Sequence, residues 1–174
     1  MYFQKTNNIK LVKLCRVIKL AICIGLIALP VSSIFFPLIG EGFFRNSQGE
    51  VVNPELKIKF LYIGIEILTD IFPILFLLNL YTLFSSYQRM AFFSQQQVIL
   101  FKKMGNWLFM TAISSLIVMT ARDVLSNSDP DTFNISISFD SSILILLCAS
   151  LVSYCIGLVM HEALINKHEI DLTI

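Results

Sequence analysis

Long apolar stretches separated by short polar segments dominate the pattern of this chain. Four stretches have the roughly 18–22 residues that an α-helix needs to cross about 30 Å of hydrocarbon at about 1.5 Å per residue. They are Leu20–Ile39, Phe60–Tyr81, Met104–Ala121 and Ile143–Leu164. No linker, low-complexity block or internal repeat divides the chain. The pattern therefore predicts an all-α fold, a four-helix bundle integral to a membrane, in which residues 1–174 form a single membrane domain.

The polar segments between the stretches predict two local features. Ser94 followed by Gln97 three residues later is typical of a capping box, so the third helix is expected to begin near Gln95, before the membrane. After the third stretch, polar and apolar residues alternate from Phe133 to Phe139. This alternation predicts a short strand-like piece in the loop that lies on the bundle.

Composition agrees with a membrane protein and excludes one class of partner. Hydrophobic residues make up 56% of the chain and charged residues only 14%, whereas soluble domains are about a quarter charged. A chain with so few charges cannot cover a water-facing surface, and the lipid bilayer is its expected surrounding. The net charge is +1 and no basic block stands out, so direct nucleic-acid binding is not expected.

The distribution of Lys and Arg predicts how the chain crosses the membrane. Nine basic residues lie before the first stretch, between the second and third, or after the fourth, and four lie in the remaining two segments. Cytoplasmic segments of membrane proteins carry the excess of Lys and Arg. Both termini are therefore expected in the cytoplasm, with the strand-like loop on the outer side.

Two acidic residues interrupt the second stretch. Glu66 and Asp70 lie four residues apart, on one face of a helix, with Pro73 three residues further on. An acidic side chain at mid-span costs about 3 kcal/mol, and the fourteen Ile, Leu and Phe residues of this stretch contribute about −6 kcal/mol in sum. Insertion is feasible only if both acids face protein or water, where burial favours the protonated form. Pro73 leaves the Thr69 carbonyl without its helical donor and is expected to bend the helix.

Polar residues at matching depth in the other stretches predict an intramembrane polar seam around these acids. Ser33, Ser115 and Ser150 are expected near the depth of Glu66. The seam itself is expected to contain Glu66, Asp70, Thr111, Ser114, Arg122, Ser153 and Tyr154. Its function is either a proton or cation relay or a ligand site, and the structural alternative is a polar clasp that fixes helix packing.

Other motifs give no catalytic chemistry. The run HEALI begins like a metalloprotease helix, but Ile165 stands where the second histidine ligand is required. The four cysteines fall in or beside apolar runs without a CxxC pair, which favours a role as small apolar side chains. We expect no catalytic residues, no metal site, no cofactor and no enzymatic activity.

The second half of the chain resembles a known family. The relevant positions are Pro73, the run Ala91-Phe92-Phe93-Ser94, Lys102 with Lys103, and the tail Asp171-Leu172-Thr173-Ile174. In this order and spacing they resemble the domain of unknown function 2975 family, small bacterial membrane proteins with four spans. The resemblance implies the cytoplasmic (inner) membrane of a bacterium and no established activity. By gene neighbourhood, it also implies a small helix-turn-helix transcription regulator as a candidate partner.

These observations favour a non-enzymatic regulatory or interaction module whose contacts lie on the cytoplasmic side. The residues expected to make them are Phe93, Ser94, Lys102, Lys103, Asp171, Leu172, Thr173 and Ile174. One alternative is a small transporter or ion- or proton-conducting homo-oligomer that uses Glu66 and Asp70. Another is an immunity protein against a membrane-active peptide.

Overall fold

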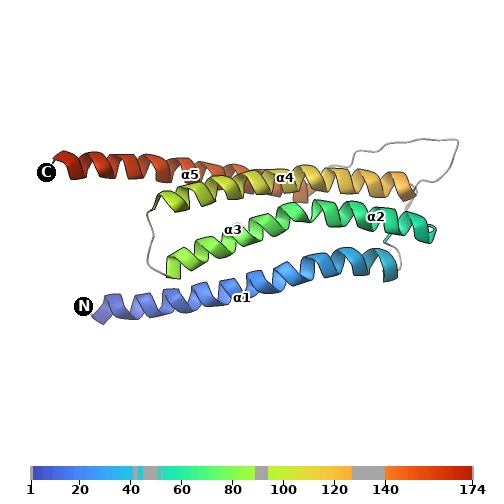
Figure 1. The fold of residues 1–174 in the computed structure, drawn as a ribbon, viewed down its shortest axis with the longest axis horizontal. Coiled ribbons are helices and arrows are strands. Elements are labelled where there is room, and N and C mark those ends of the chain that lie inside the picture. The colour runs from blue at the N-terminus through green and yellow to red at the C-terminus, as the bar shows by residue number, and fades with distance from the viewer. Residues whose placement is uncertain are drawn as a thin grey trace.

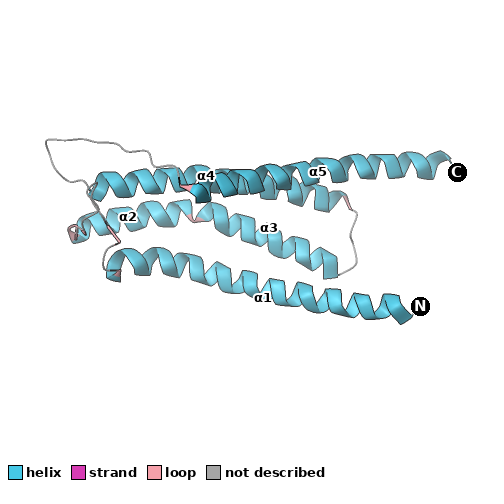
Figure 2. Ribbon diagram, turned by 180° about the vertical axis from the view of Figure 1, so that it is seen from behind, coloured by secondary structure: helices cyan, strands magenta, loops and turns pink. Residues whose placement is uncertain are grey.

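The structure is a computed structural model of the chain that describes residues 2–40, 43–44, 51, 53–88, 94–126 and 140–173. Within these residues every regular element is an α-helix, as Figure 2 shows, which confirms the all-α prediction. The strand-like piece expected from Phe133 to Phe139 lies outside the described residues. The helices are α1 (Tyr2–Ile39), α2 (Leu56–Thr69), α3 (Ile71–Gln88), α4 (Gln95–Ser126) and α5 (Ser141–Thr173).

The helices run side by side along one long axis (Figure 1). The most extensive contact joins α4 to α5, followed by those of α3 with α4 and with α1. Both termini lie at the same end of the bundle. We call this the inner end, and the opposite end, near Gly40 and Leu56, the outer end, after the orientation that the Lys and Arg distribution predicts.

Four segments are long and apolar enough to cross a membrane: Val12–Ile39, Leu56–Gln88, Gln95–Leu125 and Ser141–Asn166. Their number agrees with the four predicted spans, and their length and composition support a multi-pass membrane protein. Each segment is longer than the apolar run that predicted it, because the helices continue into polar flanks. Large apolar side chains such as Ile27 and Val159, each 68% exposed, point outward, as a lipid-facing surface requires.

The second span is two helices rather than the single helix expected from Phe60 to Tyr81. Asp70 separates α2 from α3, which meet at an angle in Figure 1. Hydrogen bonds from Asp70 N to Glu66 O (2.9 Å) and from Ile74 N to Asp70 O (3.1 Å) carry the backbone through the junction. Pro73 has no N–H to donate to the Thr69 carbonyl, so the helical ladder is interrupted here.

Small residues bring α4 and α5 close together. A Cβ added to Gly105 would lie 3.0 Å from the Ser150 carbonyl oxygen, and one added to Gly157 would lie 3.2 Å from Lys102 N. Ser150 Oγ donates to the Gly105 carbonyl at 2.9 Å, which ties the two helices together. Because this contact is antiparallel and residue-specific, it fixes the register of α5 against α4.

Candidate functional site

A cavity of about 390 Å³ lies toward the outer end of the bundle. Its wall combines residues of α2 and α4 with Pro73 of α3, Phe43, and the residues that begin α5. Five of the residues expected in the polar seam line it together: Glu66, Asp70, Thr111, Ser114 and Arg122. The structure therefore brings these five to one place.

Ser153 and Tyr154, the other two expected members, lie elsewhere. Ser153 Oγ donates to the Phe101 carbonyl at 3.2 Å, and Tyr154 packs against Gly105. The sequence prediction assigned each residue a depth by counting along its span, which assumes that the four spans begin at the same level. Instead, Ser150 pairs with Gly105, which shifts the middle of α5 toward the inner end relative to Thr111. The shift leaves only the first residues of α5 beside the cavity.

Asp70 is held from a neighbouring helix. Ser33 Oγ on α1 donates to Asp70 Oδ2 at 2.5 Å. The Ser33 Oγ atom also lies 3.0 Å from the carbonyl oxygen of Leu29 in its own helix. Ser33 is 5% exposed, so this contact is shielded from the surroundings. The pair links α1 to the junction of α2 and α3, where Pro73 has already interrupted the backbone ladder.

Glu66 differs from Asp70 in its partners. Its Oε2 atom is buried and has no hydrogen-bond partner among the described residues. An unpaired buried oxygen of this kind costs about 1–3 kcal/mol, more if it is charged. Glu66 is therefore an acceptor whose pairing the chain itself leaves incomplete.

Aromatic rings close the outer side of the cavity. Tyr62 is 2% exposed and makes edge contacts with Phe43 and Phe44, with ring centroids 5.5 and 5.4 Å apart. The guanidinium carbon of Arg122 lies 5.9 Å from the Phe43 ring centroid, within the range of a cation–π contact. Sequence reasoning had not connected Phe43 or Tyr62 with the acids, because no spacing rule relates the loop before α2 to α4.

The hydroxyl groups of the cavity wall donate to their own helices. Thr69 donates to the Glu66 carbonyl, Thr111 to that of Trp107, and Ser114 and Ser115 both to that of Thr111. A hydroxyl has one hydrogen and two acceptor lone pairs. These four side chains therefore offer only acceptor oxygens to whatever occupies the cavity.

Asp140 adds a third carboxyl group at the start of α5. Ser142 Oγ donates to Asp140 Oδ2 at 2.8 Å and Ser141 Oγ to Oδ1 at 3.2 Å. Both hydrogen bonds lower the pKa of Asp140 below its ordinary value, and the bond from Ser142 has the larger effect. Asp140 and Ser142 both line the cavity. Sequence reasoning missed them, although Asp-Ser-Ser directly before an apolar run is a helix-start signal.

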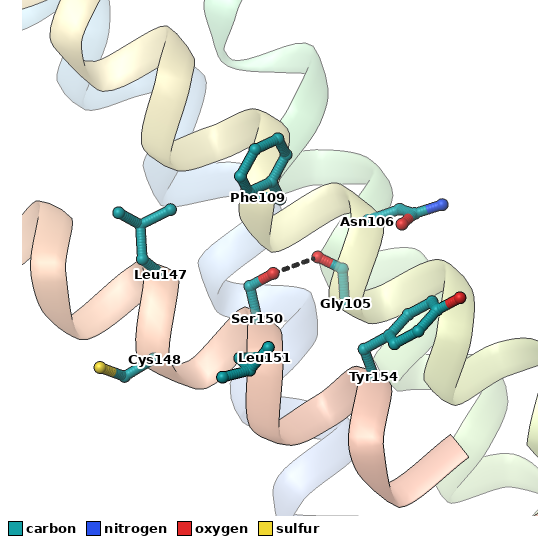
Figure 3. Close-up of a pocket in the computed structure, with 8 residues that line it drawn as sticks. All are labelled: Gly105, Asn106, Phe109, Leu147, Cys148, Ser150, Leu151 and Tyr154. Carbon is teal, nitrogen blue, oxygen red and sulfur yellow. Dashed lines mark hydrogen bonds between the residues drawn. The ribbon is translucent and has the colours of Figure 1, made fainter. Parts of the chain in front are cut away.

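A second hollow of about 460 Å³ lies between α4 and α5, on their outward side (Figure 3). Phe109, Leu147, Leu151 and Gly105 make most of its wall apolar, and Asn106, Ser150 and Tyr154 also line it. Such a furrow has the character of a lipid-facing surface and offers few polar groups to fix a ligand.

Three of the residues expected to make cytoplasmic contacts have described side chains: Ser94, Lys102 and Lys103. The Ser94 carbonyl oxygen accepts a hydrogen bond from Gln97 N at the start of α4. The side-chain stem of Lys102 packs against Gly157, and the side chain of Lys103 is exposed. Phe93 and Ile174 lie outside the described residues, and the side chains of Asp171, Leu172 and Thr173 are not described. The backbone of 171–173 continues α5 as helix.

The described part of the chain contains no group of three His, Cys, Asp or Glu side chains placed to hold a metal ion. All four cysteines are free, with Cys15 buried and the other three exposed.

A family model described as "Protein of unknown function (DUF2975)" matches residues 44–174. The match covers three quarters of the chain, from the loop before α2 to the end, so it includes every helix that lines the outer cavity, whereas α1 lies outside it. No curated protein and no solved structure matches the chain.

Proposed function

This chain belongs to the DUF2975 family of proteins of unknown function, as its second half had indicated, and we propose that it is a non-enzymatic regulatory module of the bacterial cytoplasmic membrane. In this proposal both termini are cytoplasmic. The outer cavity receives a signal, and the inner end contacts a soluble regulator.

The observation that carries the proposal is the continuity of α5. Its first residues, with Asp140, line the outer cavity, and the same helix runs without a break to Thr173. Gly157 lies beside Lys102, and α4 begins only seven residues before that lysine. In antiparallel register α5 therefore extends about nine residues, or about 14 Å, beyond the start of α4. Figure 1 shows this overhang at the inner end.

A single helix that reaches from a ligand-sized cavity to a projecting end can transmit a small displacement as a rigid element. The close packing of α4 on α5 at Gly105 and Gly157 would pass the same displacement to α4. The overhang continues the α5 backbone past the start of α4, and a soluble partner would contact it there.

The transporter alternative has less support. A relay through the bundle would need polar groups to continue from Asp70 toward the inner end. There a cluster of buried apolar side chains packs α3 against α4, although the buried side chain of Gln97 adds one polar group to this part of α4. Its members are Leu83, Leu100 and Met104, packed by Phe76, Leu80, Tyr87 and Phe101.

The test is affinity purification of the tagged full chain after cross-linking in its native membrane, compared with a chain lacking residues 168–174. We expect a soluble regulator to co-purify with the full chain and to be lost with the shortened one, while membrane insertion is unchanged. Glu55→Gln, at the outer end of α2, is the matched control and should retain the partner. Capture that is unaffected by the deletion would remove the overhang from the proposal.

A further inference from the structure

The chemistry of the outer cavity indicates what kind of ligand it can hold. Its volume of about 390 Å³ corresponds to roughly a dozen water molecules at about 30 Å³ each. It is far larger than a bare ion, and it lies in the size range of small-molecule sites.

The wall presents acceptors and few donors. Thr69, Thr111, Ser114 and Ser115 each donate to a backbone carbonyl of their own helix, so their free lone pairs face any ligand. A ligand that complements this wall must itself carry hydrogen-bond donors.

Charge leads to the same conclusion. Three carboxyl groups line the cavity, from Glu66, Asp70 and Asp140, against the single guanidinium of Arg122 among the described lining residues. A bound cation favours the ionised form of Glu66 and Asp70, which burial alone keeps protonated, whereas a bound anion would oppose that form. Because no three acidic, histidine or cysteine side chains of the described part converge on one point, an organic cation fits better than a metal ion.

The two acids of α2 are not equivalent toward such a ligand. Asp70 Oδ2 already accepts from Ser33, whereas the buried Oε2 of Glu66 has no partner in the described part of the chain. A ligand N–H that bonds Glu66 would remove the cost of that unpaired oxygen. The aromatic rings of Tyr62 and Phe43, which also line the cavity, can contact the apolar body of the ligand.

We propose that the outer cavity binds a small organic ammonium ion, with its N–H donors on Glu66 and the neighbouring hydroxyl oxygens and its apolar body against Phe43 and Tyr62. This inference deepens the proposed function and rests on it only for the role of the cavity as the receiving site.

The test uses 2-phenylethylamine as the probe and the full chain in lipid nanodiscs at pH 7, with isothermal titration calorimetry as the measurement. The N,N,N-trimethyl derivative keeps the charge and loses every N–H, and 2-phenylethanol keeps the shape and loses the charge. We expect saturable binding of the amine at one site per chain, at least about tenfold tighter than either analogue. Equal binding of all three compounds, or no saturable binding of the amine, would overturn the proposal.

Two variants locate the site. Glu66→Gln keeps the size of the side chain and should weaken amine binding at least about tenfold, whereas Glu55→Gln outside the cavity should leave it unchanged. Ser115→Leu fills the cavity from α4 without altering a carboxyl group and should also abolish binding. Amine binding that survives both Glu66→Gln and Ser115→Leu would place the ligand elsewhere and refute the site.

The chain lacking residues 168–174 separates this inference from the proposed function. It should bind 2-phenylethylamine as tightly as the full chain does, because the deletion lies at the opposite end of α5. Intact amine binding with no regulator captured by the full chain would refute the regulatory role alone. Captured regulator without amine binding would refute the ligand alone.

Discussion

Polar side chains within the spans of this protein mostly satisfy themselves inside their own helices. Asn79 donates to the Leu75 carbonyl and Thr120 to that of Leu116, each one turn back. Because these hydrogen bonds stay within one helix, they do not determine which neighbouring helix that face packs against. The side chains that reach another helix are therefore the informative ones, and Ser33, whose hydroxyl reaches Asp70, is among them.

Replacing Ser33 by alanine should destabilise the bundle by about 1 kcal/mol, because Asp70 would lose its hydrogen-bond donor from α1. Ser32→Ala is the matched control. Its hydroxyl donates only to the Leu29 carbonyl of its own helix, so little change is expected. The measurement is the free energy of unfolding in mixed micelles. Equal stability of the two variants would show that the bond between α1 and Asp70 contributes nothing to the fold.

Asp140 should titrate below the ordinary aspartate range, because the Ser142 and Ser141 hydroxyls stabilise its carboxylate. A lowered pKa in the folded state means that the carboxylate stabilises the fold above the ordinary pKa of about 3.9. That contribution is lost as the pH falls through the lowered folded value. Carboxyl carbon NMR of the labelled protein measures the pKa directly. The pKa should return upward in the Ser141→Ala/Ser142→Ala double variant; an unchanged value would contradict the assigned cause.

At the scale of elements, the register between α4 and α5 decides which residues meet. Hydropathy locates both helices but does not give their relative register, because sliding α5 by a few residues along α4 leaves its apolar content unchanged. The register is fixed by the close approach of the two helices at Gly105 and Gly157 and by two serine hydroxyls that donate hydrogen bonds across the interface.

This distinction explains which parts of the site were predictable. Glu66, Asp70 and the role of Pro73 follow from chemistry within one stretch, and the start of α4 at Gln95 follows from its local capping pattern. The placement of Ser153 and Tyr154 depended on depth counting across helices, and the structure puts both beside the inner half of α4. Asp140 contributes to the cavity because α5 begins next to it, which no local pattern specifies.

Gly105→Ala should loosen the α4–α5 interface. The added Cβ would lie 3.0 Å from both the Ser150 carbonyl oxygen and Tyr154 Cβ, so the helix backbones must separate. We expect a loss of about 1–3 kcal/mol in the free energy of unfolding. Gly64→Ala is the control, since nothing lies within 4 Å of its added Cβ, and alanine favours a helix by up to about 1 kcal/mol. If the two variants are equally stable, close packing at Gly105 is not what holds α5.

At the scale of the whole molecule, the acids and the apolar cluster occupy different halves of the bundle. The cavity lies toward the outer end, and the cluster around Leu83 and Leu100 packs α3 against α4 toward the inner end. The two halves are joined by helices that cross both of them, such as α4, and α5 runs from the cavity to the inner end.

The orientation of the bundle in the membrane, with both termini in the cytoplasm, is itself a prediction. In a variant whose four native cysteines are replaced by serine or alanine, a single cysteine at Glu55 should react with a membrane-impermeant maleimide added to intact cells. A single cysteine at Asn166 should react only after the membrane is opened. The two positions lie at opposite ends of the bundle, beside the start of α2 and near the inner end of α5. Because nine basic residues flank the inner ends and four the outer, reversal would require the charge rule itself to fail here. Labelling of the Asn166 site in intact cells would place the overhang of α5 outside, where no cytoplasmic regulator could reach it.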